Sequence, residues 1–89
     1  PMVLCGDLNV TSFSSVYARF QSMLSDAQRN FGKAHKNRPK STWPSLFPIV
    51  RPDYVFVSPD CIVRKARVFS TGQARMASDH LPLIVDLSF

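Results

Sequence analysis

The chain has 89 residues, of which 45% are hydrophobic and 19% are charged, and its formal net charge is +5. This length allows one domain with a small core, and the composition excludes a disordered chain. No apolar run is long enough for a membrane-spanning helix. The positive charge favours an anionic partner such as nucleic acid, nucleotide or phosphoinositide, or marks only a solvated surface.

The two cysteines and the first residue bear on cellular context. Cys5 and Cys61 are too few for a disulfide framework, so we expect reduced, packed thiols and favour a cytoplasmic location. Pro1 leads directly into an apolar run, which is a rare beginning for a natural domain. We therefore expect a piece of a longer protein, and an upstream anchor or export signal is left open.

The first half of the chain is predicted to form a strand followed by helices. Residues 2–8 are expected to be a fully buried strand that ends in a loop. Apolar residues at helical spacing over 15–30 predict an amphipathic helix, broken near 25–26 and ended by Gly32. Residues 33–40 are predicted to be a basic loop, which either binds phosphates or is only solvated.

The second half is predicted to form three strands. Pro52 introduces a strand over 53–57, and a strand of mixed polarity over 62–69 suits an exposed edge. A loop is expected at 71–73, and an alternating pattern predicts the last strand over 81–89. This order favours an α/β (α+β) fold with a mixed, mainly antiparallel sheet and helical cover on one face.

Asp7 and Asn9 follow the first predicted strand and are the first candidate catalytic residues. Because they are two positions apart, their side chains can point the same way. The carboxylate can accept a proton from an attacking water, and the amide can donate to a phosphoryl oxygen. The alternative is a β-turn, in which both residue types are common.

Asp79 and His80 precede the last predicted strand. Asp79 can help hold a divalent cation, because Mg²⁺ in proteins commonly takes one or two carboxylates. His80 can contact a phosphate or shuttle a proton. The alternative is a turn at Ser78 and Asp79 with an incidental histidine.

Asp53 and Trp43 lie at and before the middle strand. Asp53 stands in an otherwise apolar run, and a buried carboxylate needs a partner. That partner is an imidazole, or else Arg51 or Arg67 in a salt bridge. Trp43 either stacks on a base or sugar of a substrate or is packed in the interior.

Three strings of the chain occur in a characteristic order. They are Gly6-Asp7-Leu8-Asn9, Arg51-Pro52-Asp53-Tyr54-Val55-Phe56-Val57-Ser58 and Ser78-Asp79-His80-Leu81-Pro82-Leu83. Together they resemble the endonuclease/exonuclease/phosphatase superfamily, which has the DNase-I-like fold. The stretch Thr42-Trp43-Pro44 is similar to bacterial members.

The resemblance implies a phosphoesterase that cleaves phosphodiester or phosphomonoester bonds with Mg²⁺ or Mn²⁺. By this resemblance Asp7 positions or deprotonates the attacking water, and Asn9 holds the phosphate. Asp79 and Asp7 contribute to the metal site. His80 contacts the substrate and stabilises the pentavalent phosphate, while Asp53 orients His80.

The resemblance also implies that residues 1–89 are the C-terminal part of a four-layer α/β sandwich. The family uses an Asn and a metal-binding Glu from its N-terminal half, whereas this chain has no glutamate. We therefore expect a partial site that is inactive alone and that needs the missing N-terminal half of the domain.

The expected partners are a phosphate-ester substrate (nucleic acid, nucleotide or phospholipid) and a second copy of the chain. A homodimer would form through the sheet face that the missing half leaves exposed. The alternative function is a non-catalytic basic module that binds nucleic acid or self-associates.

Overall fold

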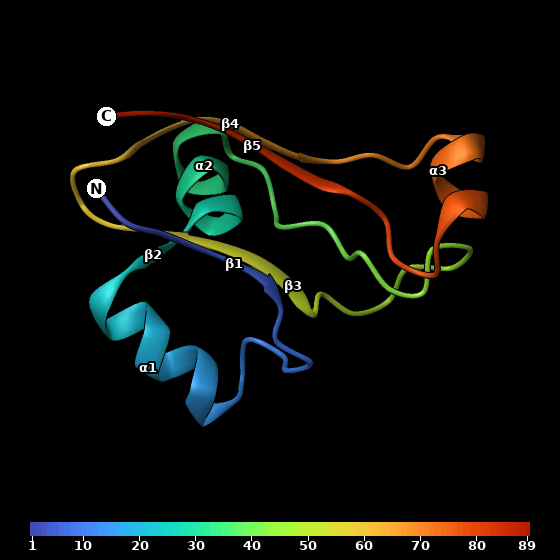
Figure 1. Cartoon of the computed structure of the whole chain (residues 1–89), viewed down its shortest axis with the longest axis horizontal. Helices are drawn as coiled ribbons and strands as arrows, with labels where there is room; N and C mark the ends of the chain where they lie inside the picture. The colour runs from blue at the N-terminus through green and yellow to red at the C-terminus, as the bar shows by residue number, and fades with distance from the viewer.

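The computed structural model describes all 89 residues. Its strands form two small sheets, and helices pack around them (Figure 1). The mixed α/β class with antiparallel sheets and helices is confirmed. The elements in chain order are β1 (Val3–Asp7), α1 (Ser15–Met23), β2 (Ser25–Asp26), α2 (Ala27–His35), β3 (Asp53–Val57), β4 (Ile62–Val68), α3 (Gly72–Ala77) and β5 (Leu83–Ser88).

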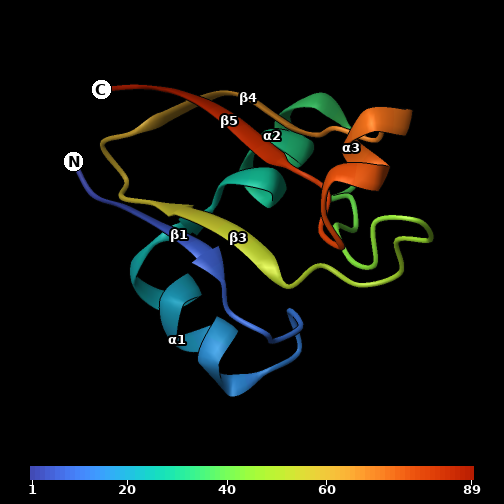
Figure 2. The same ribbon diagram turned by 45° about the vertical axis from the view of Figure 1, so that its right-hand side comes forward.

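The strands divide into two sheets in place of the single sheet expected. In the first sheet β3 is central and pairs antiparallel with both β1 and β2, while β4 and β5 form the second sheet. Figures 1 and 2 show α1 on one side of the first sheet, with α2 and the β4–β5 pair on the other side. Helices therefore cover both faces of the first sheet, because the short β2 separates them and lets the chain cross over.

The two helices are separated where the sequence predicts. Ser14 caps α1, since its hydroxyl accepts a hydrogen bond from the Tyr17 N–H at 3.1 Å. The prediction that Gly32 ends the helix is wrong, because α2 continues to His35, and the basic loop predicted over 33–40 accordingly begins only after His35. Lys36 ends α2 in a left-handed conformation with a φ of 57°.

The core lies between α1 and the central strand. Tyr17, Tyr54 and Phe56 are almost completely buried, with ring centroids 5.4 to 5.7 Å apart. Leu4 in β1 and Leu8, which directly follows β1, pack against this cluster. The aromatic cluster fixes α1 against β3 and so fixes the start of β3, where Asp53 lies.

Two further expectations about burial and secondary structure are wrong. β1 is not fully buried: it is an edge strand, and within it only Leu4 is partly covered. Cys5 is consequently exposed, whereas Cys61 is buried as expected, and both are free thiols. Residues 71–73 are not a loop, because the Thr71 hydroxyl accepts from the Ala74 N–H and caps α3.

The remaining strands agree closely with the prediction. Asp53–Val57 has the predicted bounds, while Ile62–Val68 and Leu83–Ser88 are slightly shorter than predicted. None of the helices has the length and apolar character required to cross a membrane.

Candidate active site

Strand register brings two carboxylates to one end of the first sheet. Asp7 is the last residue of β1 and Asp53 the first of β3, and the two are paired directly across the ladder. Paired residues project to the same face, so their like charges repel. The imidazole of His80 lies between them, with Nδ1 2.7 Å from Asp53 Oδ2 and Nε2 3.6 Å from Asp7 Oδ2. A protonated His80 therefore offsets the repulsion that the sheet imposes.

The loop before β3 holds His80 in this position. The Leu81 N–H donates to the Thr42 carbonyl at 2.7 Å, and the Ser45 N–H donates to the Asp79 carbonyl at 2.7 Å. These two hydrogen bonds flank His80 on both sides. The residues next to the imidazole are thereby tied to a segment that is remote in sequence.

Thr42 is a site residue that was not predicted from the sequence. It is fully buried, and its hydroxyl donates to Asp53 Oδ2 at 2.6 Å. Asp53 Oδ2 therefore accepts two hydrogen bonds, one from Thr42 and one from the His80 Nδ1–H. The only signal in the sequence was the position of Thr42 in the Thr42-Trp43-Pro44 string before β3.

The site changes the proton affinity of its imidazole. The hydrogen bond to Asp53 raises the pKa of His80 above its ordinary value and outweighs the lowering effect of partial burial. The charges of Asp53, Asp7 and Asp79 add to this rise. The charged imidazolium is stabilised because a hydrogen bond and nearby opposite charges both favour it.

Asp7 and Asn9 form the turn that was the alternative to a catalytic role. Asp7 Oδ1 accepts from the Asn9 N–H at 2.8 Å, and Asn9 has a positive φ of 53°. The turn leaves the second carboxylate oxygen of Asp7 directed toward His80. Turn formation and chemistry at Asp7 are therefore compatible.

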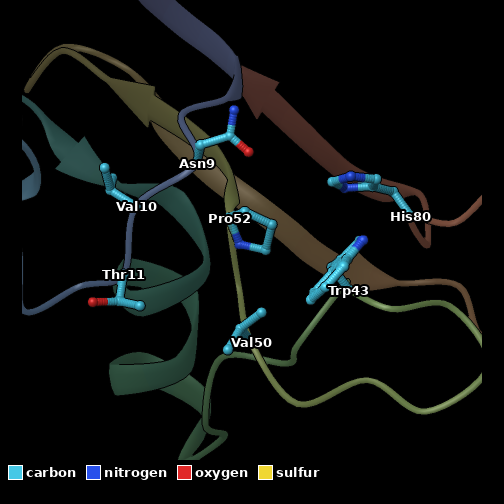
Figure 3. Close-up of a pocket in the computed structure, with 7 residues that line it drawn as sticks. All are labelled: Asn9, Val10, Thr11, Trp43, Val50, Pro52 and His80. Carbon is cyan, nitrogen blue, oxygen red and sulfur yellow. The ribbon is translucent and has the colours of Figure 1, made fainter.

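A hollow of about 230 Å³ adjoins this group (Figure 3). Its lining comes from three chain segments that meet at the start of β3: Asn9, Val10, Thr11, Trp43, Val50, Pro52 and His80. Figure 3 shows the side chains of Asn9, Trp43 and His80 around this space. Trp43 is 40% exposed, so its ring is not packed in the interior and is accessible to a ligand.

Asp79 lies apart from the other candidates. Its exposed carboxylate has the Ser78 hydroxyl as a neighbour at 3.5 Å, and it lines a different hollow with Leu46 and Met76. Arg51 and Arg67 do not pair with Asp53. Arg51 binds Asp26 at 2.7 Å, and Arg67 lies over the ring of Phe69.

The group formed by Asp7, Asp53 and His80 could hold one divalent cation at its exposed edge. Potential ligand atoms of Asp7, Asp53 and His80 lie within 4.8 Å of one another. Two carboxylates and one imidazolium leave a net negative charge, which favours a cation. Asp53 Oδ2 is already engaged in two hydrogen bonds, so Asp7, with 37% of its side chain exposed, is the open ligand. A divalent cation that keeps several of its waters can bind at a site with so few protein ligands.

A comparison of the sequence with known protein families identifies a family that is consistent with this fold and this group of side chains. The chain belongs to the Endonuclease/Exonuclease/phosphatase family, whose sequence pattern matches residues 1–80. Members of this family are generally divalent-metal-dependent hydrolases that act on phosphate esters such as nucleic acids. No curated protein and no solved structure matches the chain significantly.

Proposed function

We propose that this chain carries part of the active site of a divalent-metal-dependent phosphoesterase that cleaves phosphodiester or phosphomonoester bonds with water. The observation that carries the proposal is the imidazole of His80, held between Asp53 and Asp7 beside an open hollow. An imidazole with one nitrogen fixed and the other facing a carboxylate suits proton transfer and anion stabilisation.

Asp7 is the proposed general base. Its Oδ2, which does not take part in the turn with Asn9, takes a proton from the attacking water. The water oxygen bonds to phosphorus as the bond to the leaving group breaks, and the leaving-group oxygen keeps that electron pair and takes a proton from solvent. Negative charge grows on the phosphoryl oxygens during this step. The Nε2–H of His80 donates a hydrogen bond to one of them and stabilises that charge.

Asp53 and Thr42 are proposed as positioning residues. Asp53 holds the Nδ1–H of His80, which fixes the tautomer and orientation of the ring, and Thr42 holds Asp53. Neither residue needs to touch the substrate for this role.

Asn9 and Trp43 are the proposed substrate contacts beside His80. The Asn9 amide can donate to a phosphoryl oxygen, and Trp43 can stack on the organic part of the substrate. Both line the hollow next to His80, which supports these assignments.

The proposed metal is Mg²⁺ or Mn²⁺, held by Asp7 with Asp79 as a second ligand. When bound there, such an ion would supply positive charge to polarise the phosphate and offset the negative charge of the carboxylates. The exposed oxygen of Asp7 supports its assignment, whereas that of Asp79 depends on the sequence resemblance alone.

We also propose that residues 1–89 are the C-terminal part of the family domain. The absence of glutamate supports this, because the resemblance places a metal-binding Glu in the other half. On this proposal the isolated chain hydrolyses phosphate esters slowly or not at all.

The test is hydrolysis of bis(p-nitrophenyl) phosphate and of an oligonucleotide with Mg²⁺ or Mn²⁺. In the longer protein we expect Asp7→Asn to lower the rate by about 10²- to 10⁴-fold, the usual contribution of a general base. Asp86→Asn, an exposed aspartate on β5, is the matched control and should retain full activity.

The isolated chain is assayed beside the longer protein. Activity that Asp7→Asn abolishes in the 89-residue chain would show that it assembles a working site by itself. A longer protein with intact Asp7 and His80 that hydrolyses neither phosphodiesters nor phosphomonoesters would contradict the proposed function.

A further inference from the structure

A second, larger hollow adjoins the one beside His80. It encloses about 690 Å³ and shares Thr11 and Val50 with the first hollow, so the two lie side by side. Its lining joins the loop after β1, helix α2 and the loop before β3, and it includes Phe13, Arg29, Arg38 and Arg51. Three of the residues that line this hollow are arginines, and none is acidic.

Two of the three arginines are free to bind an anion. Arg51 is engaged with the buried Asp26. Arg29 and Arg38 are exposed and take part in none of the ion pairs of the protein. Guanidinium groups bind phosphate with paired N–H donors, so this wall of the hollow suits phosphate groups.

Phe13 gives the hollow a second, different feature. It is 97% exposed although its ring is apolar, and it belongs to the lining. An exposed aromatic ring beside phosphate-binding cations is the combination with which proteins bind unpaired bases. A phosphate-rich ligand without bases would leave Phe13 unused.

We propose that this second hollow binds a single-stranded segment of nucleic acid that extends from the phosphate held beside His80. Arg29 and Arg38 contact backbone phosphates, and Phe13 stacks on a base. The placement of the reacting phosphate rests on the proposed function. The hollow then selects a polymeric nucleic acid over a small phosphomonoester, because only a polymer reaches both hollows.

Binding of a fluorescein-labelled 12-residue oligothymidylate tests this proposal, measured by anisotropy with EDTA and without divalent metal. We expect the double variant Arg29→Gln/Arg38→Gln to bind at least about tenfold more weakly. The slope of log Kd against log salt should fall by about 1.4, the effect of losing two phosphate contacts on a single strand. Phe13→Ala should also weaken binding by about tenfold.

Matched controls remove the same groups elsewhere on the surface. Arg64→Gln/Lys65→Gln, on β4, deletes the same charge and should change Kd less than twofold. Phe89→Ala deletes another exposed ring and should have no effect. Circular dichroism and thermal unfolding verify that all variants are folded.

Several results would overturn the inference. Equal weakening by the two double variants would mean that only the overall charge matters. Tighter binding to vesicles of anionic phospholipid, with the same dependence on Arg29 and Arg38, would assign the hollow to lipid headgroups. The binding assay is run without metal, so it does not depend on hydrolysis. Binding that depends on both arginines, beside a longer protein that hydrolyses no phosphate ester with Mg²⁺ or Mn²⁺, would contradict only the proposed function. Hydrolysis of oligonucleotides that is insensitive to both arginines contradicts only this inference.

Discussion

At the scale of single residues, His80 has a structural role as well as a proposed chemical one. Strand register places Asp7 and Asp53 opposite each other, and nothing in the ladder itself relieves their repulsion. The imidazolium between them supplies the missing positive charge. The protonation of His80 should therefore affect both the site and the stability of the sheet end.

Replacing Asp53 by Asn should lower the pKa of His80 toward its ordinary value. The variant keeps the size of the side chain but removes the negative charge and the acceptor that raise this pKa. The measurement is an NMR titration of the imidazole in EDTA. Asp86→Asn is the matched control, and an unchanged His80 pKa in Asp53→Asn would show that the pair does not form in solution.

The stabilising effect of His80 should depend on pH. Because the folded-state pKa is raised, the folded chain binds the proton more tightly than the unfolded chain. The resulting stabilisation is fully present below the unfolded pKa of about 6.5 and is lost as the pH rises through the folded pKa. The difference in unfolding free energy between the native chain and His80→Gln should therefore be largest in mild acid.

Urea denaturation at a series of pH values in EDTA checks this dependence. His35→Gln is the matched control, since His35 stacks on Phe31 and pairs with no carboxylate. A difference for His80→Gln that grows as the pH rises would contradict the expected sign.

At the scale of elements, Gly32 allows α2 to continue past its predicted end and then turn back. A Cβ at this position would overlap the backbone carbonyl of Asn37, just beyond the helix. The Asn37 N–H donates to the Gly32 carbonyl at 2.9 Å, so the two backbones must approach closely. The glycine is therefore required by this close approach and not by its position as a helix terminus.

Gly32→Ala should destabilise the chain by about 1 to 3 kcal/mol, the usual effect of forcing extra volume into a packed site. Alanine has the higher helix propensity, so propensity alone predicts the opposite sign. Gly72→Ala at the start of α3 is the control, because a Cβ there meets no atom within 4 Å. Equal stability of Gly32→Ala and the native chain in urea denaturation would contradict the close approach.

The elements also show which features a sequence can reveal. The bounds of β3 were predictable because Pro52 stands just before Asp53 and the apolar run over 54–57. The break between α1 and α2 was predictable because Ser25 and Asp26 are residue types that can cap a second helix, and Asp26 is the N-cap position of α2. The burial of β1 was not, because a run of apolar residues does not reveal whether a strand is central or at an edge.

The site was predictable in part for a similar reason. Asp7, Asp53 and His80 each stand at the end of an apolar run, which made them recognisable as candidates. Thr42 contributes through its hydrogen bond to Asp53. No periodic pattern in the sequence connects these two residues, so the contact could not be predicted. The location of Asp79 in a different hollow, with Leu46 and Met76 from other segments, is likewise a feature of the tertiary structure.

At the scale of the whole molecule, many large apolar side chains of this protein are exposed to solvent. Leu46, Phe47 and Ile49 are 69%, 75% and 63% exposed in the loop before β3. Val3 is 43% exposed on β1, whose outer edge has no partner strand. Monomeric proteins seldom leave an apolar edge strand unprotected, because such an edge pairs with other chains.

We therefore expect the 89-residue chain to self-associate through β1. In sedimentation equilibrium its average mass should rise above 10.0 kDa as the concentration increases. Val3→Lys should return it toward the monomer, since a lysine on an edge strand opposes pairing. Phe89→Lys adds the same charge at the exposed C-terminus and should leave the association unchanged. A mass of 10.0 kDa at every concentration would contradict self-association. Equal effects of Val3→Lys and Phe89→Lys would mean that the added charge, and not the edge of β1, controls the association.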